Sequence, residues 1–179
     1  MAECLIVGLA GAGKSSVVAE LRSRGRLAYD ADLVPGLGRW FALDGRPSGY
    51  SSDPAWRASH QFLWDMPIVQ RLLDERDDSQ TLYLAGTATN VLDAVPLFGN
   101  VVALDVGVDT LCQRLVAASR QTPYPFDCTD KHRASLTEMV PRFRNDMLNL
   151  GATVINAELD VSQVASNLIA VMERWGARS

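Results

Sequence analysis

The sequence predicts a three-layer α/β sandwich in which helices cover both faces of a five-stranded parallel sheet. Two observations lead to this expectation. Short apolar, β-prone runs alternate with helical stretches along most of the chain. In addition, the glycine-rich segment 8–15 joins the first apolar run to the first helical stretch, which is typical of a strand–loop–helix unit. At 179 residues the chain is expected to form a single domain spanning 1–179.

The expected elements follow one another with two interruptions. The strands are apolar runs bounded by glycine or polar residues, at 4–7, 26–29, 81–85, 101–106 and 153–155. The helices lie at 16–25, 88–98, 109–119, 131–150 and 161–175. The interruptions are the segments 33–80 and 119–131. Because a connection as long as 33–80 is uncommon within a domain, we expect it to have a function; an idle surface loop is the alternative.

Composition excludes several classes of function. A formal net charge of −4 without a basic stripe argues against a nucleic-acid partner. No apolar run approaches the length of about 18 residues that a membrane span needs, so no membrane partner is expected. The three cysteines lack metal-site spacing, and their odd number argues against a disulfide framework. Reduced thiols in a cytoplasmic protein are therefore expected.

The segment 8–15 reads Gly-Leu-Ala-Gly-Ala-Gly-Lys-Ser and matches the phosphate-binding loop pattern G-x-x-x-x-G-K-[ST]. Its glycines allow backbone N–H groups to surround a polyphosphate at a helix N-terminus. Lys14 would reach the β- and γ-phosphates, and the Ser15 hydroxyl would bind Mg²⁺. A turn that only joins strand to helix is the alternative. The residues expected to bind ATP are Gly8, Gly11, Ala12, Gly13, Lys14, Ser15 and Ser16.

Two carboxylates, Asp30 and Asp32, follow the second expected strand. Ligands of open α/β sheets bind beyond the carboxyl ends of the strands, so both side chains would face the phosphates. Alternate positions on a strand would place them on one face. One could hold Mg²⁺, directly or through water, and the other could accept a proton from an attacking hydroxyl. A helix N-cap or a solvated turn is the alternative for such aspartates.

These ordered motifs resemble the small-molecule P-loop kinases, the group of shikimate kinase and the nucleoside monophosphate kinases, over nearly the whole chain. The resemblance implies the P-loop NTPase fold with strand order 2-3-1-4-5. It implies that Asp30 supports Mg²⁺ and that Asp32 contacts the acceptor hydroxyl. It also implies an acceptor-binding insertion at 33–80, where Arg57 would bind substrate, and an acceptor-site turn at Gly86.

The same resemblance implies a lid at 119–131. Arg114 would contact the adenine or the phosphates of ATP, and Arg120 would approach the transferred phosphoryl group. Arg142, or its neighbour Arg144, would close over the substrate. A guanidinium suits these roles because its fork matches phosphate or carboxylate oxygens, although a single arginine is often a solvated surface residue. Among the aromatic residues of the insertion, Trp40 is expected to form a pocket wall.

The sequence therefore predicts an enzyme that transfers the γ-phosphoryl group of ATP–Mg²⁺ to a hydroxyl or phosphate of a small-molecule acceptor. A nucleoside, a nucleotide or a polyol-like metabolite fits, and the protein would be a monomer or a homodimer. The alternative is a nucleotide-binding switch or regulatory ATPase without acceptor chemistry. The run 83–86 ends without the acidic residue that motor ATPases and GTPases normally carry there, which favours the small kinases.

Overall fold

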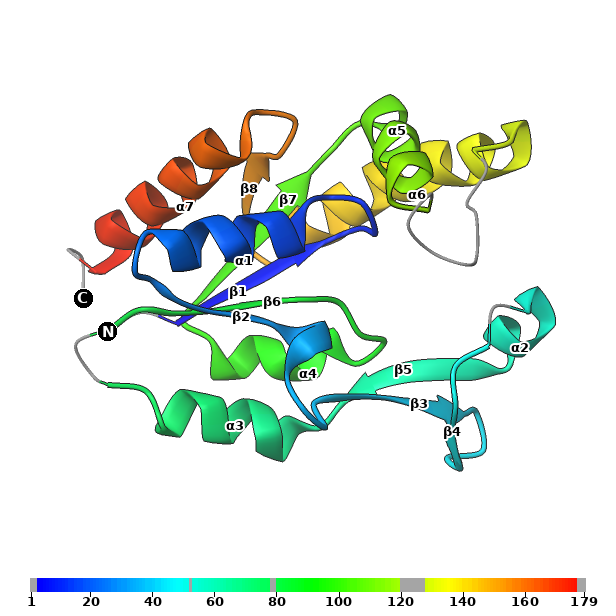
Figure 1. Cartoon of the computed structure of the whole chain (residues 1–179), viewed down its shortest axis with the longest axis horizontal. Helices are drawn as coiled ribbons and strands as arrows, with labels where there is room; N and C mark the ends of the chain where they lie inside the picture. Colours follow the sequence, from blue (N-terminus) through cyan, green and yellow to red (C-terminus); the bar gives the residue numbers. More distant parts are fainter. Residues whose placement is uncertain (1–2, 52, 78–79, 120–127, 177–179) are drawn as a thin grey trace.

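The computed structural model describes residues 3–51, 53–77, 80–119 and 128–176. Its main sheet is parallel and has the order β2-β6-β1-β7-β8 (Figure 1). The strands are β1 (Glu3–Gly8), β2 (Leu27–Asp30), β6 (Leu82–Ala85), β7 (Asn100–Asp105) and β8 (Thr153–Asn156). Numbered by their sequence within this sheet, the strands follow the predicted order 2-3-1-4-5, which confirms the fold class.

Helices pack on both faces of this sheet (Figure 1). One apolar cluster joins the sheet to α1 (Lys14–Ser23), α5 (Val108–Ser119) and α7 (Val161–Gly176). A second cluster joins the opposite face to α3 (Met66–Asp74), α4 (Val91–Ala94) and α6 (Asp130–Asn149). The helix expected at 88–98 is instead the short α4 followed by the 3₁₀ turn Val95–Leu97. Pro96 accounts for this difference because it lacks the N–H that a continuous helix would need.

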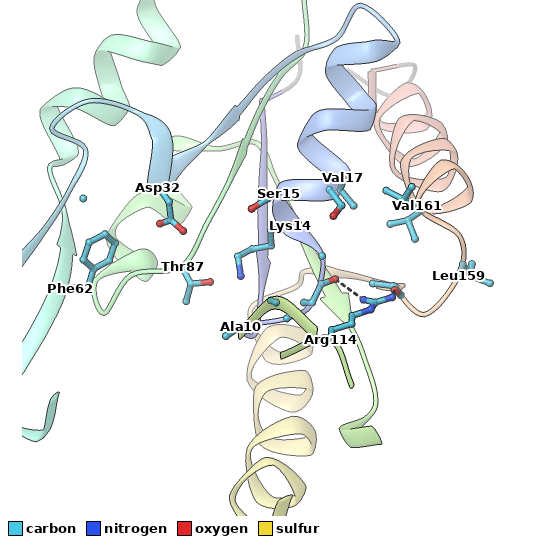
Figure 2. A pocket seen from close by; sticks show the side chains of 18 of the residues that line it. Ala10, Lys14, Ser15, Val17, Asp32, Phe62, Thr87, Arg114, Leu159 and Val161 are labelled. Carbon is cyan, nitrogen blue, oxygen red and sulfur yellow. Dashed lines mark hydrogen bonds between the residues drawn. The ribbon is translucent and has the colours of Figure 1, made fainter. Parts of the chain in front are cut away.

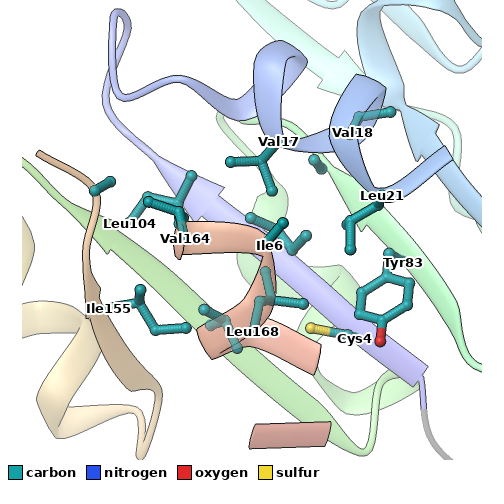
Figure 3. Close-up of a cluster of buried hydrophobic side chains, with 14 of the residues drawn as sticks. Cys4, Ile6, Val17, Val18, Leu21, Tyr83, Leu104, Ile155, Val164 and Leu168 are labelled. Carbon is teal, nitrogen blue, oxygen red and sulfur yellow. The ribbon is translucent and has the colours of Figure 1, made fainter. Parts of the chain in front are cut away.

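Alternation along β1 explains why the sheet is buried on both sides. Cys4 and Ile6 point toward α1 and α7, where Leu21 and Leu168 close the cluster shown in Figure 3. Their neighbours on β1 belong to the opposite cluster. A parallel strand covered by helices on both faces is apolar at every position, as this run is. This packing fixes the end of β1, from which the glycine-rich loop begins.

The insertion forms a small antiparallel sheet that the sequence did not predict. Its strands have the order β4-β3-β5, with bounds β3 (Gly38–Ala42), β4 (Pro47–Ser48) and β5 (His60–Trp64). The short helix α2 (Pro54–Ala58) precedes β5. Trp40 pairs with Phe62 across β3 and β5, so both side chains lie on one face. The insertion therefore presents a built surface rather than an irregular loop.

Gly86 has a packing role that differs from its predicted place at the acceptor. A Cβ atom at this position would lie 2.5 Å from Cζ2 of Trp64 and 2.6 Å from Cβ of Ala31. The absence of a side chain thus lets the insertion pack against the end of β6. Trp64, only 3% exposed, belongs to this core. Gly86 is not among the described residues that line the main cavity.

Replacing Gly86 with alanine is expected to lower the free energy of unfolding by about 1–3 kcal/mol, because the added methyl overpacks this contact. Urea unfolding followed by tryptophan fluorescence measures the change. Gly49 is a matched control, since a Cβ there would meet no atom within 4 Å. Equal loss of stability in Gly86→Ala and Gly49→Ala would contradict the packing role.

Cys112 and Cys128 form a disulfide, which corrects the expectation of reduced thiols. Their Cα atoms are 5.5 Å apart, a normal separation for a bridge. The third cysteine, Cys4, is buried in the core, and this burial raises the pKa of its thiol. The odd count of cysteines misled the sequence-based expectation because one cysteine serves only for packing.

No helix among the described residues has both the length and the apolar character needed to cross a membrane.

The disulfide joins the middle of α5 to the residues just before α6, with a sequence separation of 16. Loop-closure entropy predicts that the double variant Cys112→Ser/Cys128→Ser loses about 3 kcal/mol of stability. Thermal unfolding with and without dithiothreitol tests this. The reductant should lower the Tm of the wild type and leave that of the variant unchanged. A wild-type Tm that is insensitive to full reduction would show that the bridge does not stabilise the fold.

Candidate functional site

The glycine-rich loop runs from the end of β1 to the first turn of α1. Gly11 and Gly13 have φ angles of 83° and 94°, which side-chain-bearing residues rarely adopt. A Cβ on Gly8 would lie 3.0 Å from Cβ of Ala12, so the loop folds tightly back on β1. No side chain caps the N-terminus of α1. The backbone N–H groups of its first turn are therefore left to an anionic ligand.

Lys14 crosses the floor of this loop. Its Nζ donates hydrogen bonds to the carbonyl oxygens of Gly8 (2.7 Å) and Leu9 (3.2 Å). Burial lowers the pKa of Lys14, while the nearby Asp32 and Asp30 raise it and so favour the charged form. The ammonium group is thus held at the loop by backbone acceptors, and the nearby carboxylates favour its charge.

The two carboxylates do not occupy equivalent positions. Asp30 ends β2 and is only 6% exposed, and its Oδ1 accepts a hydrogen bond from the backbone N–H of Asp32 (3.1 Å). Asp32 lies in the 3₁₀ turn Ala31–Leu33. The expectation of alternate positions on one strand is therefore wrong, and the N-cap alternative describes Asp30. Asp30 fixes the turn that directs Asp32 into the cavity (Figure 2).

The surroundings of Asp32 suit a group that exchanges a proton. Burial and the neighbouring Asp30 raise the pKa of the Asp32 carboxyl, while Lys14 opposes the shift. A carboxylate with a raised pKa is a stronger base than an ordinary aspartate. Asp32 is thus the carboxylate that combines access to the cavity with a raised proton affinity.

The site is a cavity of about 1100 Å³ that extends to both sides of the loop. Figure 2 shows Lys14 and Ser15 in its middle, Asp32, Phe62 and Thr87 toward one end, and Arg114, Leu159 and Val161 toward the other. We call these the acceptor end and the base end. The volume exceeds that of a pocket for one drug-sized ligand, so two ligands fit side by side.

The base end is apolar apart from Arg114. Its apolar lining comes from α1, α5, the β8–α7 connection and the first turn of α7: Val17, Ala118, Ala157, Leu159, Val161 and Val164. Arg114 donates to the carbonyl oxygens of Ala157 (2.8 Å) and Ala12 (3.3 Å), so it ties the loop to this connection. Arg114 therefore lies beside the loop, and its contact with a nucleotide stays a prediction. The aliphatic residues were missed because apolar side chains carry no chemical signature in a sequence.

The acceptor end combines aromatic walls with two polar side chains. Trp40 lines it as predicted, together with Gly38, Tyr50, Phe62, Asp32 and Thr87. Thr87, another residue that the sequence reasoning missed, donates its hydroxyl to the carbonyl oxygen of Gly8 (2.9 Å). Its place directly after Gly86 was the available signal.

The predicted arginines differ in their relation to the cavity. Arg57 is exposed and does not line it, but its Nη2 donates to the Tyr50 hydroxyl (2.6 Å). Arg142 is also outside the lining, highly exposed and 3.9 Å from Asp146 on the same helix. The neighbouring Arg144 faces Asp105 at 3.4 Å. The structure therefore does not bring Arg142 or Arg144 to the acceptor. Arg120 and most of the predicted lid lie outside the described residues.

Comparison with solved structures identifies the architecture. Shikimate kinase from Acinetobacter baumannii, solved in complex with shikimate, is similar over 97% of this chain and 94% of its own, with a TM-score of 0.58 and 17% identity. The chain has the P-loop kinase fold. Deoxyadenosine kinase from M. mycoides with bound dATP (TM-score 0.54, 14% identity) matches over 97% of this chain and 100% of its own. A gluconokinase from Sinorhizobium meliloti 1021 (TM-score 0.51, 16% identity) matches over 99% and 97%.

These kinases act on different acceptors, and sequence identities of 14–17% establish a shared fold only. No protein-family model and no curated protein sequence matches the chain. The evidence for the activity of this chain therefore lies in the residues of its own cavity.

Proposed function

We propose that the chain is a small-molecule kinase that transfers the γ-phosphoryl group of ATP to a hydroxyl or phosphate of a metabolite. One observation carries the proposal. A phosphate-binding loop and the carboxylate of Asp32 share a cavity that has room for a second ligand. A switch protein or regulatory ATPase would not need a second binding end beside its loop. The likeness to kinases supports this function at the level of the fold.

The residues present fit ATP and Mg²⁺. The left-handed glycines and the uncapped start of α1 form a backbone cradle for phosphates, and the apolar base end suits a nucleobase. Mg²⁺ would be held by Ser15 and by phosphate oxygens, where it supplies charge neutralisation of the transferred group. Asp30 would act on it only through water, because its carboxylate is buried beneath the turn of Asp32.

The chain's own groups account for positioning and charge stabilisation, which dominate phosphoryl transfer. Lys14 would neutralise charge on the terminal phosphoryl group. Asp32 would orient the acceptor hydroxyl and accept its proton. The segment 33–80 would hold the acceptor, and the segment 119–131 with Arg120 would act as a lid that excludes water. The cytoplasm, where ATP and metabolites meet, is the proposed place of action.

An assay of [γ-³²P]ATP with metabolite mixtures tests the function. The proposal requires labelled product that depends on an added acceptor. Acceptor-independent ATP hydrolysis that a protein partner stimulates would favour the switch alternative. Because cytosolic reductants open disulfides, the assay is run on both the oxidised and the reduced protein.

A further inference from the structure

We infer that the acceptor is an uncharged alcohol built on a flat ring, with a nucleoside as its model compound, and that Phe62 selects it. This inference rests on the proposed kinase function and narrows its acceptor class. Three independent features of the acceptor end carry it: its aromatic wall, the glycine beneath Phe62 and the distribution of charge.

The aromatic wall is organised around Trp40. The ring centroid of Trp40 lies 5.3 Å from that of Phe62 and 5.8 Å from that of Tyr50, and all three residues line the cavity. Trp56 supports Trp40 at 4.9 Å and is itself stacked on His60 at 4.0 Å. Neither of these supporting residues lines the cavity. The wall is therefore a braced surface on which a planar ring can stack.

Gly38 determines where the ring of Phe62 lies. A Cβ on Gly38 would be 2.2 Å from Cζ and 2.8 Å from Cε1 of Phe62, distances that real atoms do not tolerate. The tip of the ring thus occupies the space that any side chain at position 38 would need. Glycine at this position holds Phe62 against β3 and keeps the acceptor end open.

The charges at this end oppose an anionic acceptor. Among the described lining residues the charged side chains are Lys14, Asp32 and Arg114. Both cations belong to the phosphate loop and the base end, which leaves Asp32 at the acceptor end (Figure 2). Arg57 is outside the lining and engaged with Tyr50, with Cζ 5.6 Å from the ring centroid. A phosphate or carboxylate on the acceptor would face Asp32 with no cation beside it among the described lining residues, at a cost in binding.

The polar groups that remain suit a hydroxyl. Asp32 accepts a hydrogen bond from an alcohol, and Thr87 lies across the same end (Figure 2). In the transfer step the alcohol oxygen forms a bond to the γ-phosphorus of ATP while the bond to the β,γ-bridging oxygen breaks. ADP leaves, and the alcohol proton passes to Asp32. An acceptor whose flat ring stacks on Phe62 and whose hydroxyl points toward Asp32 would use both the aromatic wall and the polar groups of the acceptor end.

Steady-state kinetics at saturating ATP–Mg²⁺ tests the acceptor class. The probes are adenosine, guanosine, cytidine and thymidine, their 5′-monophosphates, shikimate, gluconate and glucose. We expect at least one nucleoside to have kcat/KM at least 100-fold above its monophosphate, the sugar acids and glucose. Preference for a monophosphate, an acid or glucose would overturn the inference and leave the kinase function intact. Transfer to none of the probes overturns the inference, and absence of ATP binding removes the kinase function as well.

Phe62→Leu tests the selecting residue. Loss of a stacked ring should raise the nucleoside KM about tenfold, while the KM for ATP changes less than twofold. Phe41→Leu is the matched control, because Phe41 pairs with Gln61 and lies on the opposite face of β3. Circular dichroism and ATP binding confirm that both variants fold. A Phe62→Leu enzyme with an unchanged nucleoside KM would show that the ring does not select the acceptor.

Gly38→Ala provides a second readout. The added methyl should push the Phe62 ring into the acceptor end, so the nucleoside KM should rise about tenfold without a change in ATP affinity. Gly49→Ala, with open space around its Cβ, should behave as the wild type. An unchanged nucleoside KM in folded Gly38→Ala would contradict the placement of Phe62.

Discussion

Replacing Lys14 with alanine is expected to lower kcat for ATP-dependent transfer by about two to three orders of magnitude, the usual loss when one preorganised charge-stabilising group is removed. The Nζ atom of Lys14 is held at the loop by the carbonyl oxygens of Gly8 and Leu9, and Asp32 and Asp30 favour its charged form. Its position is therefore prepared before the phosphates arrive. Quenched-flow measurement of ADP formation separates this loss in the chemical step from slower product release.

The structure also predicts that this loss is not caused by unfolding. Burial lowers the pKa of Lys14, so the native state binds this proton less tightly than the unfolded chain does. The charge of Lys14 therefore adds no net stability to the fold, and the Tm of Lys14→Ala should stay near that of the wild type. Arg71→Ala, which removes an exposed cation on α3 outside the lining, is the matched control and should retain full activity. Unaltered transfer in Lys14→Ala would remove the phosphate loop from the proposed chemistry.

The main sheet and the phosphate loop could be predicted because their signals are local. The apolar run of β1 and the pattern ending in Lys14–Ser15 specify a strand, a turn and a helix start without reference to the rest of the chain. The strand order followed from the family resemblance. The role of Thr87 was harder to predict from the sequence. It depends on a hydrogen bond to the carbonyl oxygen of Gly8, which lies 79 positions earlier in the chain.

Other parts of the site depend on contacts that no short segment encodes. Gly86 looks like an acceptor-site turn in the sequence, yet it is glycine because Trp64 and Ala31 occupy the space around it. Cross-strand pairing of Trp40 with Phe62 places both aromatic side chains on one face of β3 and β5, and this face forms the aromatic wall. Short strands that contain glycine and proline give a weak signal, so this sheet could not be derived from pattern alone.

Asp32→Asn is expected to lower kcat by about two to four orders of magnitude, as loss of a general base does. ATP affinity should change little, because the phosphates are held by the loop. Isothermal titration with a non-hydrolysable ATP analogue checks the affinity, and acceptor-dependent turnover checks kcat. Asparagine keeps the shape of the side chain and one acceptor oxygen, but its NH₂ group cannot take up a proton, so equal turnover in this variant would exclude Asp32 as the base.

The pH dependence gives the same residue a second signature. Because burial and Asp30 raise the pKa of Asp32, wild-type kcat should fall on acidification at a higher pH than an ordinary aspartate would produce. Asp32→Asn should lack this acidic limb in its residual activity. A wild-type profile that stays flat down to the ordinary aspartate range would contradict the raised pKa.

Stability should move in the opposite direction to activity. The native state binds the Asp32 proton more tightly than the unfolded chain does, so the contribution of Asp32 to stability is greatest below its ordinary pKa of 3.8 and falls as the pH rises through the native pKa. At neutral pH the Asn variant should therefore unfold at an equal or higher Tm than the wild type, and this difference should shrink on acidification. If Asp32 is a catalytic carboxylate that lowers the stability of the fold slightly, Asp32→Asn should combine a lower kcat with an equal or higher Tm. If Asp32 only stabilises its turn, the variant should have a lower Tm.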